Sequence, residues 1–193
     1  MTITYRVGNG LYINMTNRCT NDCEFCIRTY SDSYGDSFSL WLDSEPTREK
    51  VLEEINKHDL TEYEEIVFCG FGEPTVRLDE LLWLSKQIKN NCTLPIRVNT
   101  NGHANLIAGY DTTPMFSESI DRISISLNAS SADEYNQLCK PIYGNDAYQG
   151  VLEFAKKVSA YVPETVLSVV DGTTDVEQCR LIAEKMNLPL RVR

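Results

Sequence analysis

The chain has 193 residues, 42% of them hydrophobic and 24% charged, which is the composition of a globular protein long enough to bury its own core. Its formal net charge of −10 disfavours proteins that coat nucleic acid or an anionic membrane, because such binding needs clustered positive charge. The sequence holds no apolar stretch near the roughly 20 residues of a membrane span, and its first residues do not resemble a signal peptide. We therefore expect a single cytoplasmic domain, residues 1–193, with free thiols at its seven cysteines.

Strand-like and helix-like segments alternate along the chain. Strands are expected at Leu11–Met15, Glu65–Cys69, Pro95–Asn99, Arg122–Asn128, Thr165–Val170 and Leu188–Arg193, where Val, Ile and aromatic residues are enriched. Helices are expected at Pro46–His58, Leu78–Lys89, Ser131–Leu138, Ala147–Tyr161 and Thr174–Met186. Before the first of these strands, Ile3–Val7 and the turn Gly8-Asn9-Gly10 predict a hairpin partner.

The spacing of these segments limits the choice of fold. A period of about 32 residues corresponds to roughly six βα units, whereas a full eight-unit barrel needs about 250 residues. A doubly wound sheet, covered on both faces, should have apolar strands throughout. Instead, Ser124, Ser126 and Asn128 share one face of the fourth strand, and apolar residues share the other. The pattern favours an α/β fold, an incomplete (βα)6 TIM-type barrel with parallel strands, a polar lumen and a short N-terminal hairpin extension. Polar ends on short strands are the alternative explanation.

One long connection, Arg28–Glu45, places Tyr30, Tyr34, Phe38 and Trp41 among Ser, Asp and Gly residues. Long irregular connections in compact domains often serve as lids or binding loops. We expect this segment either to cover the substrate or to pack on the outside of the domain.

Three cysteines, Cys19, Cys23 and Cys26, follow the first barrel strand with the spacing C-x3-C-x2-C. A fully ligated iron–sulfur cube needs four cysteines, so three thiolates leave one iron open to another ligand. Zinc is the main alternative, because sites of three cysteines and one histidine are common. Neither His58 nor His103 lies in a spacing that extends the cysteine cluster, so the pattern favours iron–sulfur binding.

A glycine-rich turn, Phe68-Cys69-Gly70-Phe71-Gly72-Glu73-Pro74, closes the second barrel strand. A phosphate is a poor ligand for this turn, because Glu73 repels it and Pro74 has no N–H to donate. Backbone carbonyls and a carboxylate suit an ammonium group instead. The alternative is a tight connection between strand and helix with no ligand.

Together these motifs resemble those of the radical S-adenosylmethionine (SAM) superfamily. Val98-Asn-Thr-Asn-Gly102 and Ile123-Ser-Ile-Ser-Leu-Asn128 are similar to its third- and fourth-strand motifs. More narrowly, Phe68–Pro74, Tyr135-Asn-Gln-Leu-Cys-Lys-Pro141 and Leu190-Arg-Val-Arg193 resemble the small radical SAM proteins described as TatD-family-associated. The resemblance covers nearly the whole chain.

The resemblance implies a [4Fe–4S] cluster on Cys19, Cys23 and Cys26, with S-adenosylmethionine on its open iron. One electron then cleaves S-adenosylmethionine, and the resulting 5′-deoxyadenosyl radical abstracts hydrogen from a substrate, while the protein positions the reactants. By position in the motifs, the resemblance assigns cofactor contacts to Phe25, Gly70, Gly72, Glu73, Thr100, Asn101, Ser126 and Asn128. It also implies a flavodoxin- or ferredoxin-type electron donor and a functional association with a TatD-family hydrolase.

The remaining candidates concern the substrate. Arg97, Arg191 and Arg193 have lumen parity and are expected to bind a carboxylate or phosphate, or else to pair with local acids. Cys139, expected in a loop after a helix, is a candidate hydrogen-atom donor, with packing as the alternative. A small anionic or nucleoside-like metabolite is the favoured substrate. The alternatives are an enzyme that activates or modifies a protein or peptide, and a non-catalytic module that binds a cluster or zinc.

Overall fold

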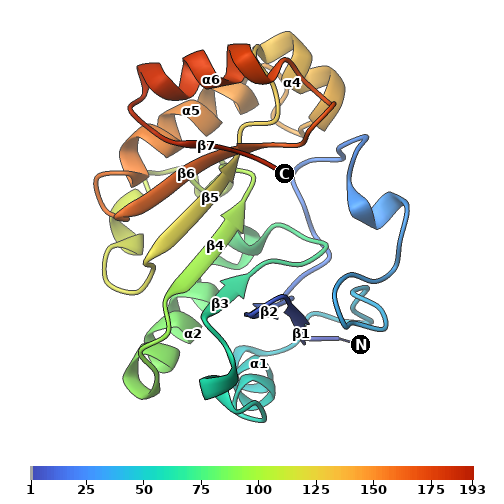
Figure 1. Cartoon of the computed structure of the whole chain (residues 1–193), viewed down its shortest axis with the longest axis vertical. Coiled ribbons are helices and arrows are strands. Elements are labelled where there is room, and N and C mark those ends of the chain that lie inside the picture. The colour runs from blue at the N-terminus through green and yellow to red at the C-terminus, as the bar shows by residue number, and fades with distance from the viewer. Residues whose placement is uncertain (1) are drawn as a thin grey trace.

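The computed structural model describes residues 2–193 and shows an α/β fold around one seven-stranded sheet (Figure 1). The strands are β1 (Thr4–Val7), β2 (Gly10–Ile13), β3 (Glu65–Phe68), β4 (Ile96–Thr100), β5 (Arg122–Ser126), β6 (Glu164–Val169) and β7 (Leu190–Val192). They lie side by side in chain order, with β1 antiparallel to β2 and every later pair parallel. Within residues 2–193, β7 does not pair with β1, so the sheet stays open on one side. The predicted incomplete (βα)6 barrel with its N-terminal hairpin is confirmed.

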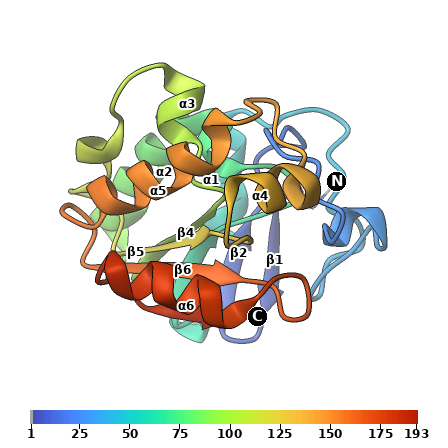
Figure 2. The same cartoon turned by 90° about the horizontal axis from the view of Figure 1, so that it is seen from above.

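Helices follow the parallel strands and form an outer layer around them (Figure 2). They are α1 (Arg48–Ile55), α2 (Leu78–Asn91), α3 (Ala104–Ala108), α4 (Ala132–Cys139), α5 (Asp146–Val158) and α6 (Val176–Lys185). Four 3₁₀ turns, η1 (Ile27–Thr29), η2 (Leu60–Glu62), η3 (Pro74–Arg77) and η4 (Thr113–Phe116), lie in the connections. Among residues 2–193, no helix has the length and apolar character needed to cross a membrane.

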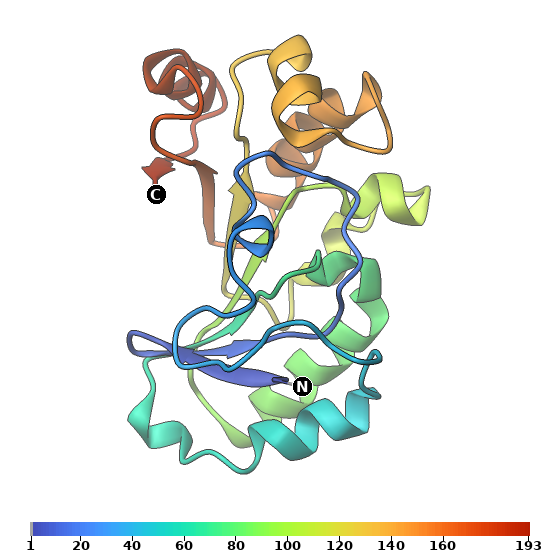
Figure 3. The ribbon, with the colours of Figure 1, turned by 90° about the vertical axis from the view of Figure 1, so that its right-hand side faces the viewer.

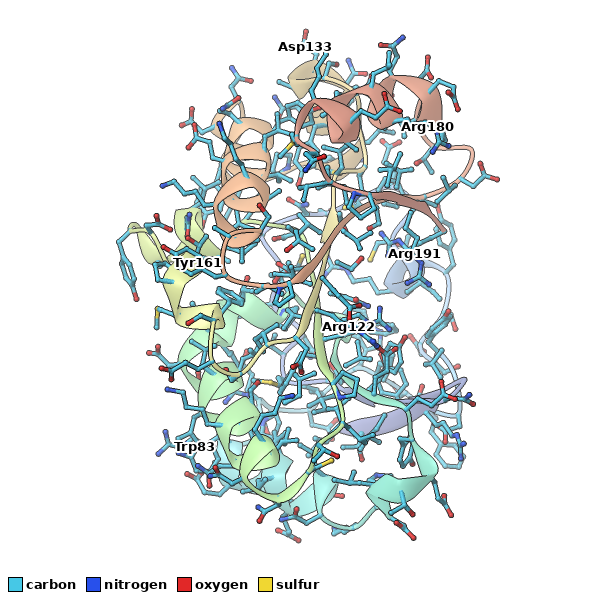
Figure 4. All side chains as sticks on the ribbon, turned by 60° about the vertical axis from the view of Figure 1, so that its left-hand side comes forward. Trp83, Arg122, Asp133, Tyr161, Arg180 and Arg191 are labelled. Carbon is cyan, nitrogen blue, oxygen red and sulfur yellow. The ribbon has the colours of Figure 1, made fainter. Side chains whose placement is uncertain are left out.

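Strand parity separates a helix-covered face from a polar lumen, as predicted. On β5, Ile123 and Ile125 are buried in the main core, while Ser124 lines a cavity of about 340 Å³ on the other face. The same cavity is lined by Arg122 and Ile123 from β5 and by Tyr12, Glu65, Arg97, Glu164, Val166 and Arg191 from the other parallel strands. Figure 4 shows Arg122 and Arg191 on this inner side of the sheet, opposite Trp83 and Tyr161 on the helical side.

Several details differ from the expectations. Helix α3 was not expected, because it has only five residues and ends at Gly109, which adopts a left-handed conformation (φ 76°). The helix expected at Pro46–His58 is shorter, because Thr47 is the N-cap, accepts a hydrogen bond from Lys50 N, and α1 spans Arg48–Ile55. Cys139 is the last residue of α4 and not part of the following loop.

The long connection after the cysteines runs along the open side of the barrel (Figure 3). Asp36 binds the backbone of Arg6 on β1, since its carboxylate accepts from Arg6 N at 2.6 Å and its own N–H donates to Arg6 O at 3.2 Å. Trp41 packs edge-on against Phe71 in the glycine-rich turn, with ring centroids 5.1 Å apart. The segment therefore packs against the hairpin and the turn, and leaves Phe38 97% exposed.

Candidate functional site

The segment from Cys19 to Cys26, here called the cysteine loop, follows β2 and lies at the carboxyl ends of the parallel strands. It is anchored to the end of α4 by two backbone hydrogen bonds, Asp22 N to Cys139 O and Glu24 N to Leu138 O, both 2.9 Å long. These bonds flank Cys23 and place its side chain beside that of Cys139. All three loop cysteines are half-buried free thiols, whereas Cys139 is fully buried and does not line the cavity.

Burial keeps the free thiols of this loop protonated. It raises the pKa of Cys19 to about 12 and also raises the pKa of Cys26. The pKa of Cys23 is raised chiefly by its hydrogen bond to Cys139 and then by burial. Metal binding must therefore displace protons, and the positive charge of the metal replaces the lost solvation. Three such thiols on one short loop fit an iron–sulfur cluster with one open iron.

The loop does not form a ready-made zinc site. Among residues 2–193, no three His, Cys, Asp or Glu side chains gather closely enough to hold a single metal ion. His103 uses both ring nitrogens in hydrogen bonds to Thr20 and Tyr135, and His58 binds Thr4 and Tyr63 at the other end of the barrel. Neither histidine is available as a fourth ligand.

The two glycines of the turn after β3 are required by close packing. A Cβ at Gly70 would lie 2.1 Å from Asn14 Oδ1, and a Cβ at Gly72 would lie 2.3 Å from the backbone oxygen of Thr16. Both neighbours belong to the segment that leads from β2 into the cysteine loop. The glycines thus let the turn pack directly against the segment that leads into the cysteine loop.

Glu73 connects this turn to the end of β4. Its Oε1 accepts from Thr75 N at 3.0 Å, Thr75 Oγ1 at 2.7 Å and Thr100 Oγ1 at 2.7 Å, and its Oε2 accepts from Asn101 N at 2.6 Å. Burial raises the pKa of Glu73, while these four donors favour its charged form. Only Oε2 retains a free lone pair, so an ammonium group at this turn would depend largely on the backbone carbonyls.

The end of β5 contributes the other predicted cofactor contacts. Asn128 adopts a left-handed conformation (φ 58°), and its Nδ2 lies 3.9 Å from Cys139 Sγ. Its Oδ1 is buried and has no hydrogen-bond partner within residues 2–193, which leaves an acceptor for a bound donor. Ser126 Oγ is 3.3 Å from Arg193 Nη2, and Phe25 packs against the main core beside the cysteines.

The three candidate substrate arginines differ in their surroundings. Arg97 binds both carboxylate oxygens of Glu65, at 2.6 and 3.1 Å, and donates to Tyr12 and Asn99. Within residues 2–193, Arg191 and Arg193 have no acidic partner. Desolvation of its guanidinium lowers the pKa of Arg193, and the nearby Arg191 and Arg97 add to the effect. The structure therefore separates a paired arginine from two unpaired ones.

Some buried residues of the site were not predicted as functional. Thr20, inside the cysteine loop, lies 2.9 Å from His103 Nδ1, and His103 Nε2 lies 3.2 Å from the Tyr135 hydroxyl. The partly buried Arg28 donates to Asn21 O at 3.2 Å and pairs with Asp22 at 3.1 Å. The sequence does place two of them beside the motifs, since Thr20 follows Cys19 and His103 follows the third-strand motif. The contacts of His103 with Thr20 and Tyr135 join residues 83 and 32 positions apart, and the spacing of a sequence does not reveal such contacts.

Comparisons with known proteins agree with this geometry. The sequence profile of the Radical SAM superfamily matches residues 13–183. Similar solved structures include a radical SAM methyltransferase from Sphaerobacter thermophilus, with 12% identity, a TM-score of 0.64 and coverage of 98% of this chain and 68% of that one. Native anSMEcpe with bound AdoMet has 20% identity, a TM-score of 0.62 and coverage of 94% and 50%. SuiB of Streptococcus suis has 15% identity, a TM-score of 0.63 and coverage of 91% and 37%.

No curated protein is similar enough to match the chain. The chain spans about two-thirds of the methyltransferase and half or less of the other two structures, and identities of 20% or lower show the shared fold alone. The profile match covers most of the chain. The chain therefore belongs to the radical SAM superfamily, whose members carry a [4Fe–4S] cluster and use S-adenosylmethionine.

Proposed function

We propose that the chain is a radical SAM enzyme that holds its cluster on Cys19, Cys23 and Cys26 and acts on a small anionic or nucleoside-like substrate in the lumen. The observation that carries the substrate class is the pair Arg191 and Arg193, two unpaired cations at the open side of the barrel. The chain as a whole has a net charge of −10, so a local positive site stands out against its surroundings.

The chain's own residues would position the cofactors. When bound and reduced, the cluster supplies the electron that cleaves S-adenosylmethionine and starts hydrogen abstraction from the substrate. The carbonyls of the turn at Gly70 and Gly72 would hold the ammonium group, and Glu73 would orient that turn through its bonds to β4. Asn128 Oδ1, buried without a partner, would accept a hydrogen bond from the cofactor.

The lumen would hold the substrate by charge. Its cavity is lined by three arginines and two glutamates, an excess of one positive charge, and Arg193 adds a second at the carboxyl end of β7. Because Glu65 pairs with Arg97 and Glu164 pairs with Arg122, the cations left to an anion are Arg191 and Arg193. A guanidinium group suits a carboxylate or phosphate, which it can bind through two parallel hydrogen bonds.

A protein or peptide substrate is the second candidate. Tyr30 and Phe38 are 75% and 97% exposed in the segment beside the open side of the barrel. Exposed aromatic residues next to an open lumen suit the docking of an extended chain. This alternative predicts that Arg193 is dispensable and that the aromatic residues are required.

The two substrate classes can be separated in one anaerobic assay. Reconstituted, dithionite-reduced protein would receive S-adenosylmethionine together with carboxylate or phosphate metabolites, neutral nucleosides, or peptides, and 5′-deoxyadenosine would be measured. We expect anionic compounds to stimulate product formation. Arg193→Gln should raise the KM for the stimulating anion about tenfold or more, since a charged hydrogen bond contributes about 1.5–3 kcal/mol.

The matched control is Arg180→Gln on the outer face of α6, where Arg180 pairs with Glu177 (Figure 4). It removes the same charge at a distance from the lumen and should leave the KM unchanged. Stimulation by peptides or neutral nucleosides alone, with Arg193→Gln unaffected, would exclude the anionic class.

Two partners belong to this proposal. A flavodoxin- or ferredoxin-type protein would supply the electron, because reduction of the cluster must come from outside the chain. The association with a TatD-family hydrolase is supported by the resemblance of Phe68–Pro74, Tyr135–Pro141 and Leu190–Arg193, and it predicts that the two proteins co-purify when produced together.

A further inference from the structure

A chain of buried hydrogen bonds connects the end of β4 to the cysteine loop. Asn101 Nδ2 donates to Thr20 Oγ1 at 2.8 Å, and Thr20 Oγ1 lies 2.9 Å from His103 Nδ1. His103 Nε2 lies 3.2 Å from the Tyr135 hydroxyl, which accepts from Asn21 Nδ2 at 2.9 Å. All five residues are at most 8% exposed. Two of them, Thr20 and Asn21, lie between the first two cysteines of the loop.

Asn101 is fixed in one orientation. Its Oδ1 accepts from His103 N at 3.0 Å, and its own N–H donates to Glu73 Oε2 at 2.6 Å. The side-chain NH2 must therefore face the cysteine loop, where it lies 3.8 Å from Cys19 Sγ as well as 2.8 Å from Thr20. One amide proton is bound by Thr20, and the other is directed at the sulfur of a predicted cluster ligand.

His103 and Tyr135 form a rigid and neutral support for this arrangement. Burial lowers the pKa of His103 to about 4, so its ring is uncharged near neutral pH. Burial also raises the pKa of Tyr135, which keeps its hydroxyl protonated. Each group is fully buried, and its partners lie on the loop and on β4. Breaking one of these bonds would leave a buried polar group unpaired, which is costly.

We propose that Asn101 is a positioning residue that donates an N–H to the Cys19 sulfur and raises the reduction potential of the bound cluster, with His103 and Tyr135 holding the loop in place. Reduction adds negative charge to the cluster and its thiolates, so a hydrogen bond to sulfur stabilises the reduced form more than the oxidised form. The inference rests on the proposed role of Cys19 as a ligand. It gives Asn101 a role in reduction that is separate from any contact with S-adenosylmethionine.

The potential can be measured without S-adenosylmethionine or substrate, by an EPR-monitored redox titration of the reconstituted cluster. Asn101→Leu keeps the size of the side chain and removes its N–H groups, so we expect a shift to a more negative midpoint potential. Asn99→Leu is the matched control. It removes an amide two residues earlier, on β4, where Asn99 Oδ1 accepts from Arg97 and, within residues 2–193, the side chain bonds to no residue of the cysteine loop. It should leave the potential unchanged.

The support is tested by a pair of tyrosine variants. Tyr135→Phe removes only the hydroxyl that joins His103 to Asn21, and we expect faster loss of the cluster to an iron chelator. Tyr148→Phe also removes one buried hydroxyl, which donates to Ala129 O at 3.2 Å away from the loop. The Tyr148→Phe protein should release its cluster at the wild-type rate.

The outcomes distinguish the proposed ligand set from the proposed role of Asn101. Wild-type protein that forms no cluster would refute the proposed ligand set. A loaded Asn101→Leu protein with the wild-type potential would overturn the inference while leaving the ligand set intact. Thermal unfolding of the cluster-free protein shows whether Asn101→Leu folds. If it does not, Asn101→Ser replaces it, because the shorter side chain does not reach Cys19. The same shift to a more negative potential is expected for Asn101→Ser.

Discussion

At Gly72 the turn after β3 passes so close to the cysteine loop that no side chain fits. A Cβ there would lie 2.3 Å from Thr16 O and 2.6 Å from Arg18 O, and backbone atoms cannot move aside cheaply. We expect Gly72→Ala to lower the free energy of unfolding of the cluster-free protein by about 1–3 kcal/mol, as forced overpacking does. Urea denaturation measures the change.

Gly150 in α5 provides the control for this substitution. The nearest atom to an added Cβ is Leu106 Cδ1 at 2.6 Å, the end of a flexible side chain that can rotate away. Alanine is also favoured over glycine in a helix by about 1 kcal/mol. Gly150→Ala should leave stability unchanged or increase it, and equal losses for the two variants would contradict the explanation by close approach.

His103 makes stability depend on pH. Its folded pKa of about 4 lies below the ordinary value of 6.5, so the unfolded chain binds a proton that the folded chain excludes. The contribution is fully present above pH 6.5 and is lost as the pH falls toward 4. Between pH 6.5 and 4, the free energy of unfolding of the cluster-free protein should fall by about 3 kcal/mol more than that of His103→Gln. Parallel pH–stability curves for the two proteins would rule out a buried neutral histidine.

Among the elements, the central strands are joined by ion pairs inside the lumen. Glu65 on β3 binds Arg97 on β4 at 2.6 Å and Arg122 on β5 at 3.5 Å, and the Arg97 side chain is 12% exposed. Glu65→Gln leaves two arginines without their shared carboxylate and should lower the free energy of unfolding by about 2 kcal/mol.

The same change should strengthen the binding of anions, because it frees Arg97. Glu164→Gln is the comparison, since Glu164 is 60% exposed and pairs with Arg122 alone, so a small loss of stability is expected. Isothermal titration with inorganic phosphate measures the binding. A Glu65→Gln protein that binds phosphate more weakly than the wild type would show that the freed arginine does not face the ligand.

The period and the parity of the strands favoured the barrel and indicated the lumen side of four of its strands. The polar series Ser124, Ser126 and Asn128 allowed this, because it alternates with residues that helices cover. The partners of those side chains could not be predicted in the same way. Arg97 was placed in the lumen correctly, but its pairing with Glu65 depends on the register of β3 and β4. The contact of Asn101 with Cys19 depends on a loop 82 residues earlier in the chain.

In the molecule as a whole, the core lies mostly outside the cysteine loop, which packs Cys23 and Phe25 against it. The main core contains residues from β2 to β6 and from the helices around them, while the three loop cysteines are only half-buried. A Cys19→Ala, Cys23→Ala, Cys26→Ala protein should therefore retain the far-UV circular dichroism of the cluster-free wild type and lose cluster absorption near 400 nm. An unfolded triple variant would show that the cysteines are structural.

The most direct test of radical SAM chemistry in this chain is anaerobic cleavage of S-adenosylmethionine. The protein would be reconstituted with iron and sulfide, reduced with dithionite and assayed for 5′-deoxyadenosine beside a Cys26→Ala control. We expect product from the wild type and none above background from Cys26→Ala, and a change in the EPR spectrum of the reduced cluster when S-adenosylmethionine is added. A wild-type protein that forms its cluster but yields neither product nor a spectral change would contradict radical chemistry at this site.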